Sequence, residues 1–297
     1  MSPGFTAFVI FIKYAIFCVR AEEIFEIMDD LEELNEEYKH LPKASEIISK
    51  ANKLTLKVTT PLKWGCIFTV ILYILKPLVT DFISYFYLGI EPSRELILKG
   101  KFPYDASQSP AYQLTFLYQT YSTILVGMIV YVMSLNFTTF TLNIAAHLQI
   151  LRDSINDLKI DEFVKYHMKI ISITKRLNSI YSPMIFTQFF IETTLFVGLG
   201  LCIVSADNWI EKVKPILHVF GAVVDVACHS FGSQQIMDSS EAICDEAHKI
   251  DKDYIMVIMT AQKKFRITTA FFDASFETYS FMLSRTWSLI SLFNEFS

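Results

Sequence analysis

The sequence predicts an all-α protein whose helices cross a membrane several times. Of its 297 residues, 52% are hydrophobic and only 19% are charged, and the mean hydropathy is +0.37. Soluble domains usually have about 25% charged residues. The apolar residues also gather in runs of about 20, the length that a helix needs to span a bilayer. No basic tract with interleaved aromatic residues predicts nucleic-acid binding.

Six apolar runs are candidate membrane helices in one transmembrane domain, 1–297. They lie near 5–20, 64–90, 112–147, 183–206, 215–233 and 267–293. The first run is short, Lys13 interrupts it and acidic residues follow it. A cleaved signal peptide instead has a basic start and a small-residue cleavage site. A spanning or partly spanning helix is therefore favoured, with a signal peptide as the alternative.

Three polar segments between these runs, 22–60, 148–176 and 234–266, are predicted to form helices beside the membrane. In the first of them, apolar residues recur every three or four positions: Ile24, Ile27, Leu31, Leu34 and Tyr38. Acidic residues fill the other faces. This period is typical of an amphipathic helix with one packed face.

The lysines and arginines predict the orientation. They are frequent in 22–60, 148–176 and 234–266 and sparser in 91–111, 205–214 and the C-terminal tail. Because cytoplasmic loops carry more positive residues, the first set is expected inside the cell. The first helix would then enter from outside without a signal peptide. We therefore expect a further helix before Met1, which would give seven spans and an intracellular N-terminus.

Motifs of enzyme chemistry were not found. The sequence has no His-Glu-x-x-His, Gly-x-Ser-x-Gly or phosphate-binding loop, and its histidines lack metal-ligand spacing. The five cysteines are scattered without a Cys-x-x-Cys pair, although a disulfide to Cys202 remains open. We expect a protein that is not an enzyme, with no catalytic residues, metal site or cofactor.

Two groups of residues inside the runs are candidates for function. Ionisable residues in a membrane are costly and mark functional sites by default: Lys76, Asp81, Glu192, Asp225, Asp273 and Glu277. For Glu192, an internal hydrogen-bond partner and a functional group remain equally open. Aromatic residues in the outer halves form either an ordinary interfacial belt or a pocket for a small apolar ligand: Phe8, Phe82, Tyr85, Tyr118, Tyr121 and Phe220.

The last third of the chain contains several short motifs in a particular order and spacing. They are Cys228-His229-Ser230-Phe231-Gly232-Ser233, Ser239-Ser240, Ile258-Met259-Thr260-Ala261-Gln262-Lys263-Lys264, Phe271–Leu283 and Trp287-Ser288-Leu289. In this order and spacing they resemble the C-terminal region of insect odorant receptors. Upstream, Phe102-Pro103-Tyr104 and Ser109-Pro110-Ala111-Tyr112 resemble the outer loop of the family. Trp287 and Leu289 depart from the tyrosines usual there.

The resemblance implies an inverted seven-helix topology, with about six helices present and a cytoplasmic helical layer that anchors the subunits. It implies an odorant-binding tuning subunit of a ligand-gated cation channel, a heterotetramer with a shared co-receptor, in the plasma membrane of olfactory sensory neurons. Small volatile odorants and the lipid bilayer are the other partners. By position, Leu292 and Phe296 would form a hydrophobic gate.

Other membrane classes fit less well. A gustatory receptor shares the fold, but its C-terminal motif matches 287–294 poorly. A G-protein-coupled receptor requires the opposite topology, and a transporter predicts paired repeats with broken helices. A truncated, non-functional receptor fragment remains a further alternative.

Overall fold

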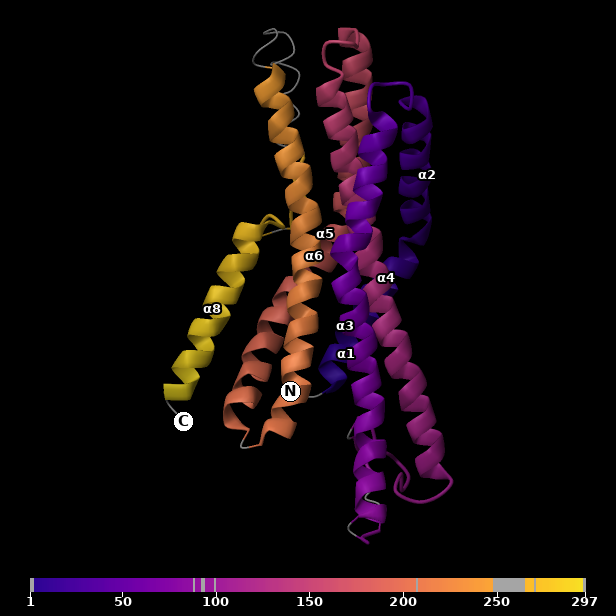
Figure 1. Ribbon diagram of the computed structural model, residues 1–297, viewed down its shortest axis with the longest axis vertical. Coiled ribbons are helices and arrows are strands. Elements are labelled where there is room, and N and C mark those ends of the chain that lie inside the picture. Colours follow the sequence, from indigo (N-terminus) through magenta and orange to yellow (C-terminus); the bar gives the residue numbers. More distant parts are fainter. Residues whose placement is uncertain are drawn as a thin grey trace.

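The computed structural model describes residues 3–87, 89–91, 94–98, 100–206, 208–247, 265–269 and 271–295. Within these residues the structure is helical, and the only β-type pairing is an isolated bridge between Thr268 and Asp273. Seven helices follow one another along the described chain (Figure 1). They are α1 (Pro3–Val19), α2 (Ala21–Glu37), α3 (Ala44–Phe86), α4 (Ala111–Asp153), α5 (Ile160–Ser205), α6 (Trp209–Ala247) and α8 (Phe276–Glu295).

Four of these helices are long and apolar enough to cross a membrane: α3, α4, α5 and α6. The helix α1 has 17 residues, slightly fewer than the roughly 20 that a span needs. The helix α8 has 20 residues and is not among the four. The protein is therefore a multi-pass helical bundle, while spans by α1 and α8 stay predictions.

Several boundaries differ from those that the sequence predicts, because polar and apolar segments join into single helices. The last part of the predicted cytoplasmic segment 22–60 and the predicted span 64–90 form one helix, α3, which begins at Ala44 and ends at Phe86. Pro61 lies inside α3 without ending it. The hydroxyl groups of Thr59 and Thr60 donate to the carbonyl oxygens of Thr55 and Leu56, at 2.8 and 2.5 Å. Such bonds support backbone groups near a helical proline.

The predicted last span, 267–293, begins too early. Residues 267–269 and 271–275 precede the helix, and the N–H of Ala274 donates to the carbonyl of Ile267 at 2.9 Å. The helix α8 begins at Phe276, where the N–H of Thr278 donates to the hydroxyl of Ser275 at 3.2 Å. A serine that caps the first turn explains this start. Within the predicted cytoplasmic segment 234–266, residues 248–264 lie outside the described residues.

The core and the exposed apolar surface occupy different parts of the molecule. Fully buried side chains gather where α2 packs against the C-terminal part of α4 and the N-terminal part of α5 (Figure 1); they include Ile27, Leu148, Leu151, Phe163 and Ile170. Large apolar side chains remain exposed on the apolar lengths of α3 and α4, among them Trp64, Phe68, Leu114 and Leu117. This division fits a water-exposed layer with its own core and a layer whose apolar surface faces lipid.

Candidate functional site

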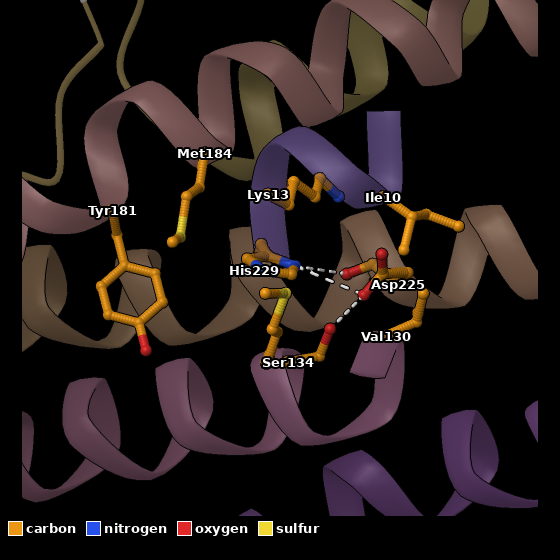
Figure 2. A pocket seen from close by; sticks show the side chains of 9 residues that line it. Ile10, Lys13, Val130, Ser134, Tyr181, Met184, Asp225 and His229 are labelled. Carbon is orange, nitrogen blue, oxygen red and sulfur yellow. Dashed lines mark hydrogen bonds and ion pairs between the residues drawn. The ribbon is translucent and has the colours of Figure 1, made fainter. Parts of the chain in front are cut away.

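A small cavity lies inside the bundle, between α1, α4, α5 and α6. Its volume is about 20 Å³, which is room for a water molecule. Apolar side chains form part of the wall, and a few polar groups converge on it (Figure 2). The lining residues are Ile10, Lys13, Val130, Met133, Ser134, Tyr181, Met184, Asp225 and His229. This combination is typical of small-molecule sites.

Asp225 connects three of these helices. Its carboxylate accepts a hydrogen bond from the hydroxyl of Ser134 on α4, and another from the amide Nε2 of Gln188 on α5, at 2.6 Å. His229 lies one turn further along α6, with Nδ1 2.9 Å from the backbone oxygen of Asp225 and 3.6 Å from its carboxylate (Figure 2). Asp225 is only 4% exposed. A buried carboxylate is retained at low cost only when it is hydrogen-bonded in this way.

A second carboxylate and a lysine complete the polar cluster. The same Nε2 of Gln188 donates to Glu192 Oε1 at 2.9 Å, so that one amide joins two acidic side chains. Lys13 projects from α1 toward this space and is attracted by both Asp225 and Glu192 (Figure 2). Two acidic side chains and one basic side chain therefore lie between apolar helix surfaces, where an unpaired charge is costly.

Some polar atoms of the cluster lack a partner within the part of the chain that the structure describes. They are Oε1 of Gln188, Oε2 of Glu192 and the hydroxyl of Tyr181, and all three are buried. Buried polar groups without a partner are rare, and an ordered water or a ligand often satisfies them. These atoms can therefore accept hydrogen bonds from a small molecule, and the hydroxyl of Tyr181 can also donate one.

The predicted aromatic pocket residues lie elsewhere. The side chains of Phe82, Tyr85, Tyr118, Tyr121 and Phe220 are 54%, 60%, 71%, 61% and 53% exposed. None of them lines the cavity. They belong to α3, α4 and α6, and such exposure fits the interfacial belt as well as a pocket that forms later. Their role in binding stays a prediction.

The remaining predicted site residues lie only partly within the described part of the chain. Phe8 belongs to α1, although its side chain lies outside the described part. Leu292 lies on α8 and is 48% exposed, and Phe296 lies outside the described residues. The gate that both residues would form therefore stays a prediction.

Two of the ionisable residues singled out in the sequence come together in the cluster. Asp225 and Glu192 share the amide of Gln188. Asp81 binds the loop between α3 and α4, since its carboxylate accepts a hydrogen bond from the N–H of Arg94 at 3.1 Å. Asp273 pairs with Arg266 at 3.1 Å. Sequence reasoning did not single out Gln188, although its position four residues before Glu192, on the same helix face, is a usable signal.

The helix α8 joins the bundle close to this cluster. The hydroxyl of Tyr279 donates to the backbone oxygen of Val223 on α6 at 3.1 Å. Further along, Ile290 packs into the space left by Gly200 on α5, where an added Cβ would lie 2.3 Å from its Cδ1. The opposite side of α8 exposes Phe281 and Trp287. The helix is thus held along one face.

The predicted cytoplasmic layer is tied together by ion pairs between α2 and α5. Glu37 pairs with Lys169 and, at 3.5 Å, with Lys165. Arg176 pairs with Asp30 and, at 3.4 Å, with Glu26. The hydrogen bond from Lys169 holds the pKa of Glu37 below its ordinary value.

Metal and disulfide chemistry find no support in the described part of the chain. Residues there form no group of three or more His, Cys, Asp or Glu side chains that could hold a metal ion. The five cysteines are free, including Cys202, so the structure contains no disulfide to it.

Comparisons with known proteins agree on one family. The family model described as "7tm Odorant receptor" matches residues 1–286. Among curated Drosophila melanogaster proteins, the chain is 25% identical to odorant receptor 82a over 98% of this chain and 82% of that protein. It is 23% identical to odorant receptor 47a over 91% of this chain and 75% of that protein.

Solved structures show the same fold. The chain superposes on the insect olfactory receptor OR5 from Machilis hrabei in complex with eugenol with a TM-score of 0.83. The sequences are 16% identical, and the match covers 98% of this chain and 79% of that one. A second structure of the same receptor gives a TM-score of 0.82 at 15% identity.

Proposed function

The chain belongs to the 7tm odorant receptor family of multi-pass membrane proteins, and from this premise we propose that it is a tuning subunit. As a tuning subunit it binds a small volatile odorant and forms a ligand-gated cation channel together with a shared co-receptor. It acts in the plasma membrane of olfactory sensory neurons, with its loops 22–60, 148–176 and 234–266 inside the cell.

One observation carries this proposal: the family model matches residues 1–286, which include every helix that borders the cavity. The similar receptor from Machilis hrabei is described in complex with eugenol, a small organic molecule. The cavity adds support from this chain itself, because apolar walls with a few polar groups suit a molecule of that kind.

The mechanism follows from a difference in affinity. An odorant opens the channel only if it binds the open arrangement of helices more tightly than the closed one. The cavity provides the polar end of the binding site, through Asp225, His229 and Tyr181. The aromatic residues toward the outer ends, Phe82 and Tyr121 among them, provide its apolar part once the helices separate.

The pore belongs to α8 in this proposal. Leu292 on α8 and Phe296 form an apolar constriction, which blocks ions while it is dry and conducts when it widens and fills with water. The exposed residues Phe281 and Trp287 on the same helix are then available for contacts with other subunits.

The test is the current that odorants evoke in cells expressing this chain with and without the co-receptor. A panel of volatiles is applied, and surface expression is measured in parallel. We expect a cation current that requires both proteins. A Leu292→Ala variant should change the current at equal surface expression, whereas Leu117→Ala, a matched change on an exposed leucine of α4, should not.

Two results would contradict the proposal. Silence across a broad panel, with both proteins at the surface, would argue against an odorant-gated channel. A full response without the co-receptor would argue against the tuning role. A second messenger signal in the absence of current would point to a different mode of signalling.

A further inference from the structure

A short stretch of α6 touches both the cavity and α8. Asp225 and His229 line the cavity. Two residues before Asp225, the backbone oxygen of Val223 accepts the hydrogen bond from Tyr279 of α8 at 3.1 Å. Less than two turns of helix therefore separate the polar cluster from the anchor of α8.

The cavity must enlarge before a ligand can occupy it. Its volume is about 20 Å³, whereas sites for small organic ligands have about 300–1,000 Å³. Asp225 is bonded to Ser134 on α4 and to Gln188 on α5. Because these bonds link three helices, a molecule that widens the cavity must stretch them or shift α6 relative to α4 and α5.

A shift of α6 reaches α8 directly, because the two helices are in contact at Tyr279 and again between the rings of Phe231 and Phe276. On the bundle side, α8 contributes the buried side chains of Met282, Thr286 and Ile290, while Phe281 and Trp287 are exposed. The hydroxyl of Tyr279 donates to a backbone carbonyl of α6. The length of this hydrogen bond therefore changes when α6 itself moves, and does not depend on the rotamer of an α6 side chain. Losing such a bond changes an equilibrium constant by roughly fivefold.

We propose that residues 223–229 of α6 couple the cavity to α8. At the cavity, Asp225 connects this segment to α4 and α5 through its hydrogen bonds. The hydrogen bond between Tyr279 and Val223 keeps α8 in the position that it has while the cavity is small. This inference rests on the proposed function, because it takes α8 to be the helix that gates the pore. Tyr279 is a positioning residue, since it does not line the cavity, whereas Asp225 also belongs to the proposed binding site.

The first test is Tyr279→Phe, which removes the hydroxyl and leaves the ring. With the co-receptor present, we expect the half-maximal odorant concentration to fall about fivefold and the current without odorant to rise, because the small-cavity arrangement has lost a bond. The matched control is Ser280→Ala, which removes the neighbouring, exposed hydroxyl of α8. An unchanged or higher half-maximal concentration in Tyr279→Phe would overturn the proposal.

The second test measures the coupling itself. Asp225→Asn is combined with Tyr279→Phe, and the half-maximal concentrations of the single and double variants form a double-mutant cycle. A double variant that differs by threefold or more from the product of the single effects supports the coupling. Agreement within that limit overturns it. If Asp225→Asn fails to reach the cell surface, Ser134→Ala takes its place and removes one donor to the same carboxylate.

A measurement without odorant separates this inference from the proposed function. The same cycle is run on the melting temperature of the detergent-solubilised full chain. If the unmodified receptor gives no current with its co-receptor, the proposed function fails, and the melting cycle alone decides the coupling. Shifts that are not additive support a coupled segment in α6, and additive shifts overturn it.

Discussion

At the scale of single residues, Gln188 has the most demanding position in the cluster. Its Nε2 donates to Asp225 at 2.6 Å and to Glu192 at 2.9 Å, and the residue is only 2% exposed. The two hydrogen atoms of one amide group therefore serve two carboxylates that would otherwise repel each other. An apolar residue of similar size would leave both acidic groups without this donor.

We therefore expect Gln188→Leu to destabilise the folded receptor by about 1–3 kcal/mol. The measurement is the melting temperature in detergent, followed by the fraction of protein at the cell surface. The control is Thr187→Val, since the hydroxyl of Thr187 donates within its own helix, to the carbonyl of Pro183 at 2.7 Å. Equal stability of Gln188→Leu and the control would show that the amide does not hold the cluster together.

Part of this cluster could be predicted from the sequence. The other members could not, because only the three-dimensional packing of the helices brings them together. Asp225 and Glu192 stood out because charged residues are rare in apolar runs. Ser134 and Gln188 are ordinary polar residues in such runs, and only the three-dimensional approach of α4, α5 and α6 makes them partners. The predicted aromatic residues were chosen by depth, which leaves the direction of a side chain undetermined.

At the scale of helices, glycine sets how closely α8 approaches α5. A Cβ at Gly200 would lie 2.3 Å from Cδ1 and 2.9 Å from Cγ1 of Ile290, which is closer than atoms in contact allow. Small residues at helix contacts in membranes permit such close packing. The side chain of Ile290 can therefore pack against α5 here because Gly200 has no side chain.

Gly200→Val should push α8 away from α5 and lower the melting temperature, at a cost of about 1–3 kcal/mol for an overpacked contact. Ile290→Ala in the same protein should restore part of the loss, because it removes the clashing atoms. Gly221→Val on α6 is a suitable comparison, since no atom lies within 4 Å of a Cβ there. If the double variant is no more stable than Gly200→Val, the two residues do not pack as described.

The ion pairs between α2 and α5 predict how the cytoplasmic layer responds to acid. Because Lys169 lowers the pKa of Glu37 in the folded protein, this carboxylate stabilises the fold at any pH above its unfolded value of about 4.3. The contribution disappears as the pH falls through the lower, folded pKa. The unmodified receptor should therefore lose more stability below about pH 4.3 than Glu37→Gln does. If acid lowered the melting temperatures of the two proteins by the same amount, this assignment would be wrong.

Helix positions followed from the sequence better than helix ends did. The apolar runs located α3, α4, α5 and α6, because a stretch of about 20 apolar residues has few other uses. The change from polar to apolar surroundings does not interrupt a helix, so the predicted boundary between the segment 22–60 and the span 64–90 has no counterpart in α3. The start of α8 depends on the turn before Ser275, which the apolar pattern hides.

At the scale of the whole molecule, the bundle has two ends of different character. One end contains the ion-paired and well-buried contact of α2 with α4 and α5, and the other contains the loop between α3 and α4 (Figure 1). That loop is fastened to α4 by Gln119, whose side chain exchanges two hydrogen bonds with the backbone of Leu98, at 3.0 and 3.1 Å. The charge bias predicts the first end inside the cell and the loop outside.

Glycosylation tests this orientation, because the sugar is added only to acceptor sites that reach the extracellular side. The double change Ala106→Asn with Gln108→Thr creates an acceptor sequence in the loop between α3 and α4, and we expect it to be glycosylated. Leu158→Thr completes an acceptor with Asn156 in the turn between α4 and α5, and it should remain unmodified. A mass shift on gels that a glycosidase removes is the readout. Modification at Asn156 together with none at position 106 would reverse the topology and place the ion-paired layer outside the cell.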